Sequence, residues 1–180
     1  MREVTISSKR VFEGKLLKID SLEVSCDGDG RTIREVVRHP GAVAAIARKR
    51  DGRFVFVRQY RKAVERETLE IVAGLLEEDE DADECIVREV GEETGYRVVK
   101  TVRLGQVKSS PGYTEENVAI YYAELGEQDG ILQQDDDEFV EVEDYSLEEV
   151  ESMLASNGIE DAKTYAAWWL YCRAAEDGRL

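Results

Sequence analysis

Apolar and polar positions alternate in short runs through the first part of the chain. The runs cover residues 11–12, 16–24 and 33–37, and glycine-containing turns separate them. Short runs bounded by turn residues are typical of β-strands, and Pro40-Gly41 then interrupts the pattern. Residues 1–39 are therefore predicted to form a small antiparallel β subdomain ahead of a larger domain at residues 40–180.

The next segment predicts a hairpin within a core sheet. Two apolar runs, at residues 42–48 and 54–58, flank the dipeptide Asp51-Gly52. An Asp-Gly pair between such runs is a strong hairpin signal, because both residues tolerate the backbone angles of a tight turn. Additional strands are predicted for the apolar runs at residues 98–107, 117–125 and 139–142.

A helical period replaces the strand pattern at residues 83–94. Ile86, Val87 and Val90 make one apolar face of this helix. Gly95 stands where the end of a helix favours a left-handed residue. This segment is predicted to carry the chemistry of the protein.

Two further helices are predicted near the C-terminus. Ser146 and Glu149 have the spacing of a capping box, which opens a helix that continues to about residue 154. The last helix is predicted for residues 161–175 and ends at Gly178. Its two tryptophans, Trp168 and Trp169, are expected in the core or in an interface.

Composition narrows the classes of function. At 180 residues the chain can bury a sizeable core. Its 40 acidic residues against 24 Lys and Arg give a net charge of −16, so an average surface repels nucleic acid and anionic lipid. A phosphorylated ligand would need this charge screened, which indicates divalent cations held by oxygen ligands. The alternative is that the acidity serves solubility or a salty cytoplasm.

The cysteines and the apolar content predict a cytoplasmic protein. Cys26, Cys85 and Cys172 are odd in number and far apart, so neither a disulfide framework nor a zinc site is expected. The first residues lack the apolar stretch of a secretory signal, and no run approaches the ~20 apolar residues of a membrane span. The cytoplasm is the expected compartment.

Three glutamates crowd one face of the predicted central helix. At 100° per residue, Glu89, Glu92 and Glu93 fall together beside the apolar stripe. Like charges at this spacing cost about 0.2–0.5 kcal/mol per pair, and a bound cation would reverse the sign of this effect. Magnesium takes oxygen ligands and commonly bridges carboxylates to phosphates. The alternative is a solvated helix face without a ligand.

The spacing around these glutamates resembles a known signature. Gly74 is followed after five residues by Glu80, and after seven more by Arg88-Glu89. The pattern continues with a bulky residue, one variable residue and Glu92-Glu93. It ends with another variable residue, Gly95 and a second bulky residue. Every fixed position resembles the signature box of the Nudix hydrolases. Tyr96 stands where that family more often has an aliphatic residue, which bears on packing.

The resemblance implies an α+β fold in which helices sandwich a mixed β sheet, with the small β subdomain added. It implies hydrolysis of a nucleoside diphosphate linked to another group, with Mg²⁺ or Mn²⁺ as cofactor. Glu89 and Glu93 match metal ligands, Arg88 matches the arginine that holds the glutamates, and Glu92 matches a ligand or a water-orienting acid. Gly74 permits a tight turn, and Glu80 ties the box together.

Features outside the box resemble the ADP-ribose pyrophosphatase branch of the family. They are the segments 57–61 and 69–74 and the turn around Pro111. The likeness implies substrate-binding roles for Arg58, Arg61, Glu70 and Pro111, and a metal contact through the backbone carbonyl of Ala73. The alternatives are ordinary surface charge for the two arginines and a plain turn at the proline.

The branch also uses an acid from a late loop to orient or deprotonate water. Asp135, Asp136, Asp137 and Glu138 precede Phe139, and Asp137 and Glu138 are the preferred catalytic acids. The implied reaction converts ADP-ribose to AMP and ribose 5-phosphate. The alternatives are another nucleoside diphosphate sugar such as GDP-mannose, or a non-catalytic nucleotide sensor.

The resemblance also bears on partners. Related enzymes pack or exchange their N-terminal β segment, so a homodimer is expected, with residues 1–39 as the dimerisation region. No nucleic acid or membrane partner is expected. His39, beside Pro40, is predicted to be structural rather than catalytic.

Overall fold

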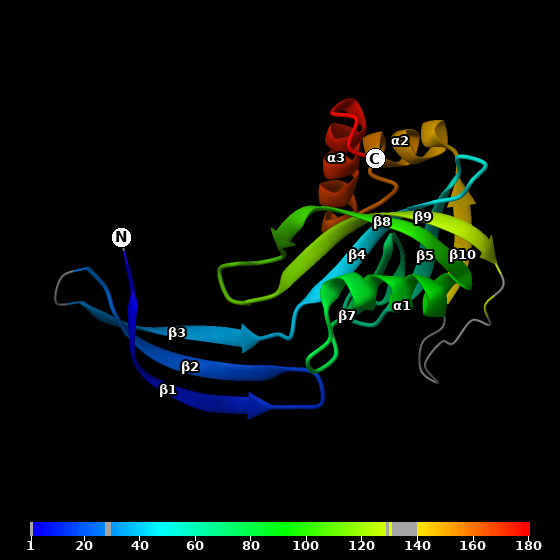
Figure 1. Cartoon of the computed structure of the whole chain (residues 1–180). Helices are drawn as coiled ribbons and strands as arrows, with labels where there is room; N and C mark the ends of the chain where they lie inside the picture. The colour runs from blue at the N-terminus through cyan, green and yellow to red at the C-terminus, as the bar shows by residue number, and fades with distance from the viewer. Residues whose placement is uncertain (1, 28–29, 129, 131–139) are drawn as a thin grey trace. The chain divides into compact units, whose positions relative to one another are not determined.

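A computed structural model describes residues 2–27, 30–128, 130 and 140–180, and Figure 1 shows its strands and helices. The chain divides into two compact units. The first contains residues 1–41 and 108–117, and the second contains residues 42–107 and 118–180.

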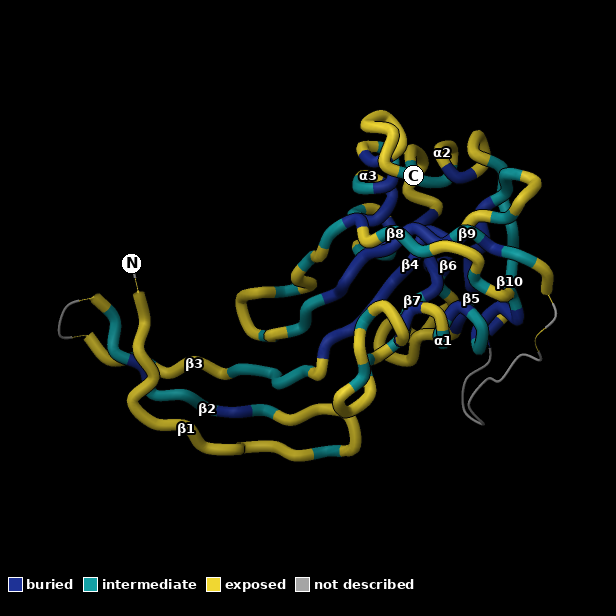
Figure 2. The backbone as a smooth tube through the Cα atoms, viewed as in Figure 1, coloured by how far each residue is buried: buried dark blue, intermediate teal, exposed yellow. Residues whose placement is uncertain are grey.

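The first unit contains a three-stranded antiparallel sheet in the order β1-β2-β3. Its strands are β1 (Val4–Glu13), β2 (Lys18–Ser25) and β3 (Arg31–Arg38). The strand prediction for the start of the chain is therefore confirmed. Residues 108–117 join β3, because Val37 exchanges backbone hydrogen bonds with Tyr113 and Glu115. Figure 2 shows β1 exposed along its length, so this sheet buries little apolar surface within the chain.

The second unit is built on a mixed sheet of seven strands. The path β10-β5-β4-β9-β8 makes most of the sheet, and two short strands, β6 and β7, pair with β5 and β4. The strand β4 runs parallel to β9 and antiparallel to β5 and β7, so the sheet is mixed as predicted. The strands are β4 (Ala42–Arg48), β5 (Phe54–Arg61), β6 (Arg66–Glu70), β7 (Val72–Leu75), β8 (Tyr96–Lys108), β9 (Asn117–Gln128) and β10 (Val140–Tyr145).

The turn between β4 and β5 confirms the predicted hairpin. The N–H of Lys49 donates to the carbonyl of Arg53 at 2.8 Å, and the N–H of Gly52 donates back to Lys49 at 3.0 Å. Gly52 adopts a φ of +92°, which costs glycine little because it has no Cβ.

Three helices cover the two faces of this sheet: α1 (Ala82–Thr94) on one face, and α2 (Leu147–Ala155) and α3 (Ala162–Glu176) on the other (Figure 1). Alternate residues of a strand point to opposite faces. Accordingly Val43 and Val55 pack with the apolar stripe of α1, whereas Ile46 and Phe54 pack with α2 and α3. The α/β/α sandwich is confirmed. No helix in the described part of the chain is both long and apolar enough to cross a membrane.

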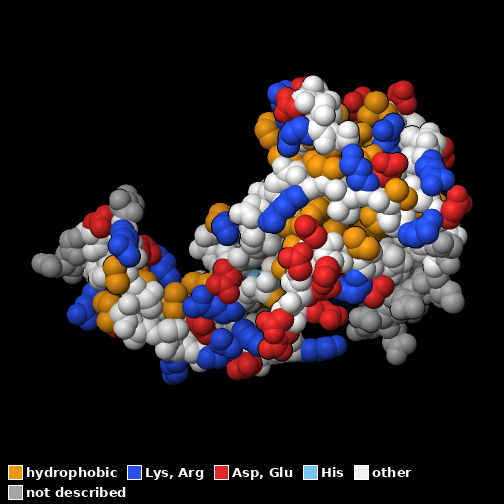
Figure 3. Space-filling model, viewed as in Figure 1, with side chains coloured by type: hydrophobic (Ala, Val, Ile, Leu, Met, Phe, Trp, Pro, Cys, Tyr) orange, Lys and Arg blue, Asp and Glu red, His pale blue; other side chains and the backbone are white. Residues whose placement is uncertain are grey.

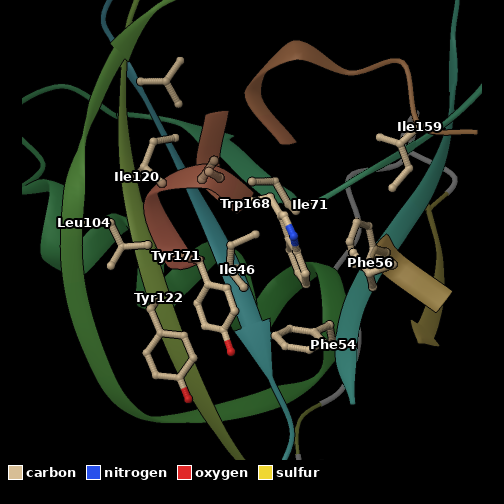
Figure 4. Close-up of a cluster of buried hydrophobic side chains, with 14 of the residues drawn as sticks. Ile46, Phe54, Phe56, Ile71, Leu104, Ile120, Tyr122, Ile159, Trp168 and Tyr171 are labelled. Carbon is tan, nitrogen blue, oxygen red and sulfur yellow. The ribbon is translucent and has the colours of Figure 1, made fainter. Parts of the chain in front are cut away.

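Aromatic and aliphatic side chains share the core between the sheet and α3 (Figure 4). The ring of Phe54 meets Trp168 and Tyr171 edge-on, with centroids 5.0 and 5.4 Å apart. Such pairs add about 1 kcal/mol each to the burial of apolar area. Trp168 is 7% exposed, so its predicted core position is confirmed, whereas Trp169 is 64% exposed and does not lie in the core.

The strands β6 and β7 were not predicted from the sequence pattern. They bridge the region where β4 and β5 separate, since β5 pairs with β4 only near its start and with β6 further on. Ile71 lies between the two short strands, and its N–H donates to the hydroxyl of Thr164 in α3 at 3.1 Å. Thr164 is fully buried. Helix α3 therefore supplies the hydrogen-bond acceptor for the backbone N–H of Ile71, where the chain passes from β6 to β7.

Candidate active site

The helix α1 presents its acidic face at the edge of the core. Asp81 caps its N-terminus by accepting from the N–H of Asp83 at 2.8 Å, and Gly95 ends it in the left-handed region with φ +70°. Cys85, Ile86 and Val90 are its buried apolar residues, which confirms the predicted helix and its end. The prediction of Val87 on the apolar face is wrong, since Val87 is 44% exposed and Cys85 takes its place in the core. Figure 3 shows acidic side chains gathered over this part of the second unit.

Arg88 lies among three carboxylates. Its guanidinium donates to both oxygens of Glu80 at 2.8 and 2.9 Å, to Glu89 at 2.9 Å and to Glu92 at 2.8 Å. These contacts raise the pKa of Arg88. The hydrogen bonds from Arg88 and from the N–H of Glu77 lower the pKa of Glu80 to about 2. A guanidinium therefore offsets part of the repulsion between the glutamates, as the resemblance implied for Arg88.

Gly74 in β7 makes room for Glu89. A Cβ on Gly74 would lie 1.8 Å from the carboxyl carbon of Glu89, far inside van der Waals contact. Any side chain at position 74 therefore displaces the Glu89 carboxylate. This close approach, rather than a left-handed backbone angle, explains the glycine.

Glu93 reaches the same strand one residue earlier. It is 9% exposed, and one carboxylate oxygen accepts from the N–H of Ala73 at 3.4 Å. The structure thus brings Ala73, Glu89 and Glu93 to the junction of β7 and α1, although they are up to 20 residues apart in the chain.

The donor chemistry at this junction fits a hard divalent cation. The available ligands are carboxylate oxygens and a backbone carbonyl, the type that Mg²⁺ and Mn²⁺ bind in proteins. Within residues 2–27, 30–128, 130 and 140–180, no three His, Cys, Asp or Glu side chains converge as a metal-binding group. Glu89 and Glu93 with the Ala73 carbonyl would therefore share the coordination with substrate oxygens, water or acids outside these ranges.

A second ion cluster surrounds Glu70 at the end of β6. Its two oxygens accept from Nε and Nη2 of Arg61, both at 2.8 Å, and Lys163 of α3 makes a salt bridge to the same carboxylate. Thr68 donates a further hydrogen bond at 2.6 Å. Burial alone would raise the pKa of Glu70, but Arg61, Lys163 and Thr68 outweigh it and lower the pKa to about 2.

The Glu70 cluster interacts electrostatically with one glutamate of α1. Glu93 contributes to the raised pKa of Arg61, after the larger effect of the Glu70 hydrogen bonds. Two residues predicted to bind substrate, Arg61 and Glu70, therefore lie together and within electrostatic reach of a predicted metal ligand. Lys163 was missed in the sequence, since a lysine in the first turn of a helix is ordinarily solvated and carries no recognisable signal.

Arg58 lies apart from this cluster. It has the strand phase of Phe54 and Phe56, so it points toward the face covered by α2 and α3, whereas Arg61 has the opposite phase. Its Nε donates to Glu143 in β10 at 2.5 Å. The proposed contact of Arg58 with substrate remains a prediction.

The remaining predicted residues lie in the first unit or outside the residues that the structure describes. Pro111 is exposed in the segment that forms part of the first unit. Asp137 and Glu138 lie outside the residues that the structure describes. His39 uses its Nδ1 to accept from the N–H of Gly41 at 3.1 Å, a contact in keeping with the structural role predicted for it.

Comparison with known proteins identifies a domain family. The model of the NUDIX domain matches residues 38–168, a range that includes the whole of α1 and all seven strands of the mixed sheet. A crystal structure of an ADP compounds hydrolase has a TM-score of 0.85 and 20% sequence identity, and the match covers 100% of this chain and 98% of that chain. At this identity the likeness concerns the fold.

Two relatives align along nearly the whole chain. The ADP-ribose pyrophosphatase of Bacillus subtilis (strain 168) is 37% identical over 177 residues, which cover 97% of this chain and 96% of that protein. The methanol dehydrogenase activator of Bacillus methanolicus is 37% identical over 166 residues, which cover 92% and 90%. The two relatives have different names but the same sequence identity to this chain. The assignment of a substrate therefore depends on the site residues.

Proposed function

The chain belongs to the Nudix family, and from this premise we propose that it hydrolyses the diphosphate bond of ADP-ribose to AMP and ribose 5-phosphate with Mg²⁺. The observation that carries the proposal is the junction of β7 and α1, where Glu89 packs on Gly74 and Glu93 contacts Ala73. The relative in Bacillus subtilis, matched over 97% of this chain, supports ADP-ribose as the substrate.

We assign the cofactor to the carboxylates of Glu89 and Glu93 and the carbonyl of Ala73. When bound there, Mg²⁺ or Mn²⁺ would act as a Lewis acid on the diphosphate and lower the pKa of a bound water. Arg88 holds the carboxylates of Glu89 and Glu92 close to one another at 2.9 and 2.8 Å from its Nη1. This hold keeps them in place before substrate arrives.

The remaining roles follow from charge and position. Arg61, beside the α1 glutamates, binds the anionic diphosphate, and Glu70 orients Arg61 through two parallel hydrogen bonds. Glu92, together with Asp137 or Glu138, orients the attacking water and accepts its proton. Arg58 and Pro111 are proposed to complete the substrate contacts.

We further propose a cytoplasmic homodimer. The sheet of the first unit exposes several large apolar side chains, and a second copy of the chain would remove them from water. They are Val4, Ile6, Val11, Phe12, Leu16, Leu17 and Ile33. The cytoplasm is proposed from the sequence, where three widely spaced cysteines do not favour a disulfide framework. Light scattering tests the dimer: a monomer at micromolar concentration contradicts it.

The activity is tested with a panel of substrates. Purified protein is incubated with Mg²⁺ and ADP-ribose, GDP-mannose or other nucleoside diphosphate sugars, and the products are identified by chromatography. AMP and ribose 5-phosphate, formed fastest from ADP-ribose, are the expected result. Faster turnover of GDP-mannose selects the alternative substrate, and calorimetric binding of ADP-ribose without product under Mg²⁺ selects the nucleotide sensor.

A further inference from the structure

Lys163 lies outside every motif considered above, yet it contacts a residue of the proposed site. It is the second residue of α3, and its Nζ makes salt bridges with Glu70 and, at 3.1 Å, with Asp161. Its side chain is 19% exposed and that of Glu70 is 5% exposed. A cation held this far from solvent, against a buried carboxylate, is unusual for a lysine in the first turn of a helix.

The Glu70 carboxylate is shared between two cations. One oxygen accepts from Nε of Arg61 and from Thr68, and the other accepts from Nη2 of Arg61 and from Lys163. Arg61 is thus gripped along one edge of its guanidinium. Lys163 holds the same carboxylate through the oxygen that also accepts from Nη2 of Arg61, so the orientation of Arg61 depends on Lys163 through Glu70.

Hydrogen bonds fix the N-terminus of α3. Asp161 caps the helix by accepting from the N–H and the hydroxyl of Thr164, at 3.1 and 2.6 Å. Thr164 in turn accepts from the N–H of Ile71, the residue that follows Glu70. Lys163 therefore extends from a helix N-terminus that is hydrogen-bonded to Ile71, next to Glu70. This contact limits the positions that its ammonium group can take.

The local charge gives Lys163 a second effect. Arg61 and Lys163 are set against the carboxylates of Glu70, Asp161 and Glu93. Without Lys163, one guanidinium would face three carboxylates, and the cluster would repel an approaching diphosphate more strongly. Arg61 is exposed, but Glu70 is buried and Lys163 and Asp161 are largely buried, so water and salt screen this change only in part.

We propose that Lys163 is a positioning residue for diphosphate binding: by sharing Glu70 with Arg61, it orients Arg61 and preserves the positive charge that the substrate meets. This inference rests on the proposed function, because it takes Arg61 as the residue that receives the diphosphate. Lys163 acts through Glu70 and touches neither the substrate nor the attacking water.

The test compares four variants by binding and by kinetics. The dissociation constant of ADP-ribose is measured by calorimetry in EDTA, where hydrolysis is blocked, and KM and kcat are measured with Mg²⁺. K163M removes the charge but keeps a stem of similar length, K163Q keeps a hydrogen-bond donor without charge, and K163R restores the charge. K62M is the matched control, since Lys62 adjoins Arg61 but is 81% exposed and paired with Glu65.

K163M and K163Q are expected to raise both the dissociation constant and KM about tenfold, with kcat within about threefold of the wild type, because the lost contact orients the binding group. K163R should recover affinity to within about threefold, and K62M should match the wild type. A role confined to holding α3 in place would lower the unfolding temperature without this separation of KM from kcat.

Wild-type affinity and KM in a folded K163M or K163Q protein would overturn the proposal, as would an equal loss in K62M. If K163M does not fold, K163Q and K163R decide the question. A wild-type protein that binds ADP-ribose without hydrolysing it refutes the proposed reaction but leaves the binding test of Lys163 intact. A wild-type protein that does not bind ADP-ribose overturns both.

Discussion

The two ion clusters of the second unit differ in their ratio of charges. On α1 one guanidinium, Arg88, is shared by three carboxylates, and the Glu92 side chain is 36% exposed. At the end of β6 one carboxylate, Glu70, is shared by Arg61 and Lys163 and is 5% exposed. The first cluster sets one positive charge against three negative charges. In the second, Arg61 and Lys163 share Glu70 and also lie near Asp161 and Glu93.

This difference explains how an acidic chain can bind a polyanion. With a net charge of −16 the average surface opposes a diphosphate. In the proposed function the carboxylates of α1 would hold the metal ion, and the Glu70 cluster keeps the cations of Arg61 and Lys163 in place despite the surrounding acid. Each cluster is proposed to bind one partner of a metal–diphosphate pair.

The largest effect on activity is expected when a proposed metal ligand is removed. E93Q deletes one negative charge at the junction of β7 and α1, and we expect kcat to fall on the order of a thousandfold because the cofactor loses a ligand. AMP release with Mg²⁺ measures the effect. E84Q is the matched control, since Glu84 is an exposed residue of the same helix and should leave the rate unchanged. A wild-type rate in E93Q would refute the metal assignment.

Acid should weaken the Glu70 cluster. The folded-state pKa of Glu70 is lowered to about 2 from an ordinary value of 4.5, so its contribution is present above pH 4.5 and is lost as the pH falls toward 2. The shift corresponds to at most about 3 kcal/mol of stability. Urea unfolding of wild type and E70Q from pH 6 to pH 2.5 measures it.

The two proteins should differ in unfolding free energy at pH 6 and approach each other at the acid end. A difference that stays constant with pH would show that Glu70 is not held ionised by its partners. Glutamine is the matched replacement because it keeps the shape of the side chain and removes only the charge.

Removing Arg88 should destabilise the α1 cluster and make the protein depend on added cations. R88M leaves Glu80, Glu89 and Glu92 without their shared partner, and we expect a loss of about 2 kcal/mol, less than for a fully buried pair because the site is partly exposed. Millimolar Mg²⁺ should recover more stability in R88M than in the wild type. Thermal unfolding with and without Mg²⁺ checks this. An equal response to Mg²⁺ would argue against a cation site among these carboxylates.

The smallest effect on stability and affinity is expected for Thr164, which binds the backbone next to Glu70. T164V leaves the N–H of Ile71 without its acceptor, at a cost of about 1 kcal/mol. No charge changes, so the affinity for ADP-ribose should fall less than in K163M. Denaturant unfolding and calorimetry on the same samples test both statements. A larger affinity loss in T164V than in K163M would mean that the backbone at Ile71, and not the shared carboxylate, positions Arg61.

Local patterns predicted most of the elements that carry the site. The helix at residues 83–94 and its glycine end follow from a period of 3.6 residues and one left-handed position, both properties of neighbouring residues. The short strands β6 and β7 escaped prediction because four or five residues give too little alternation, and because charged residues begin β6. Their pairing depends on where β4 and β5 separate.

The acidic face of α1 could be predicted from the order of its residues, because helical geometry alone sets the angle between side chains on one helix. The sequence by itself also determined the hairpin at Asp51-Gly52 and the box that resembles the Nudix signature. The approach of Glu89 to Gly74 and the salt bridge of Lys163 with Glu70 were decided only by the tertiary structure. The second contact joins residues 93 positions apart, and a separation of that size is closed by the packing of α3 on the sheet, which no local pattern encodes.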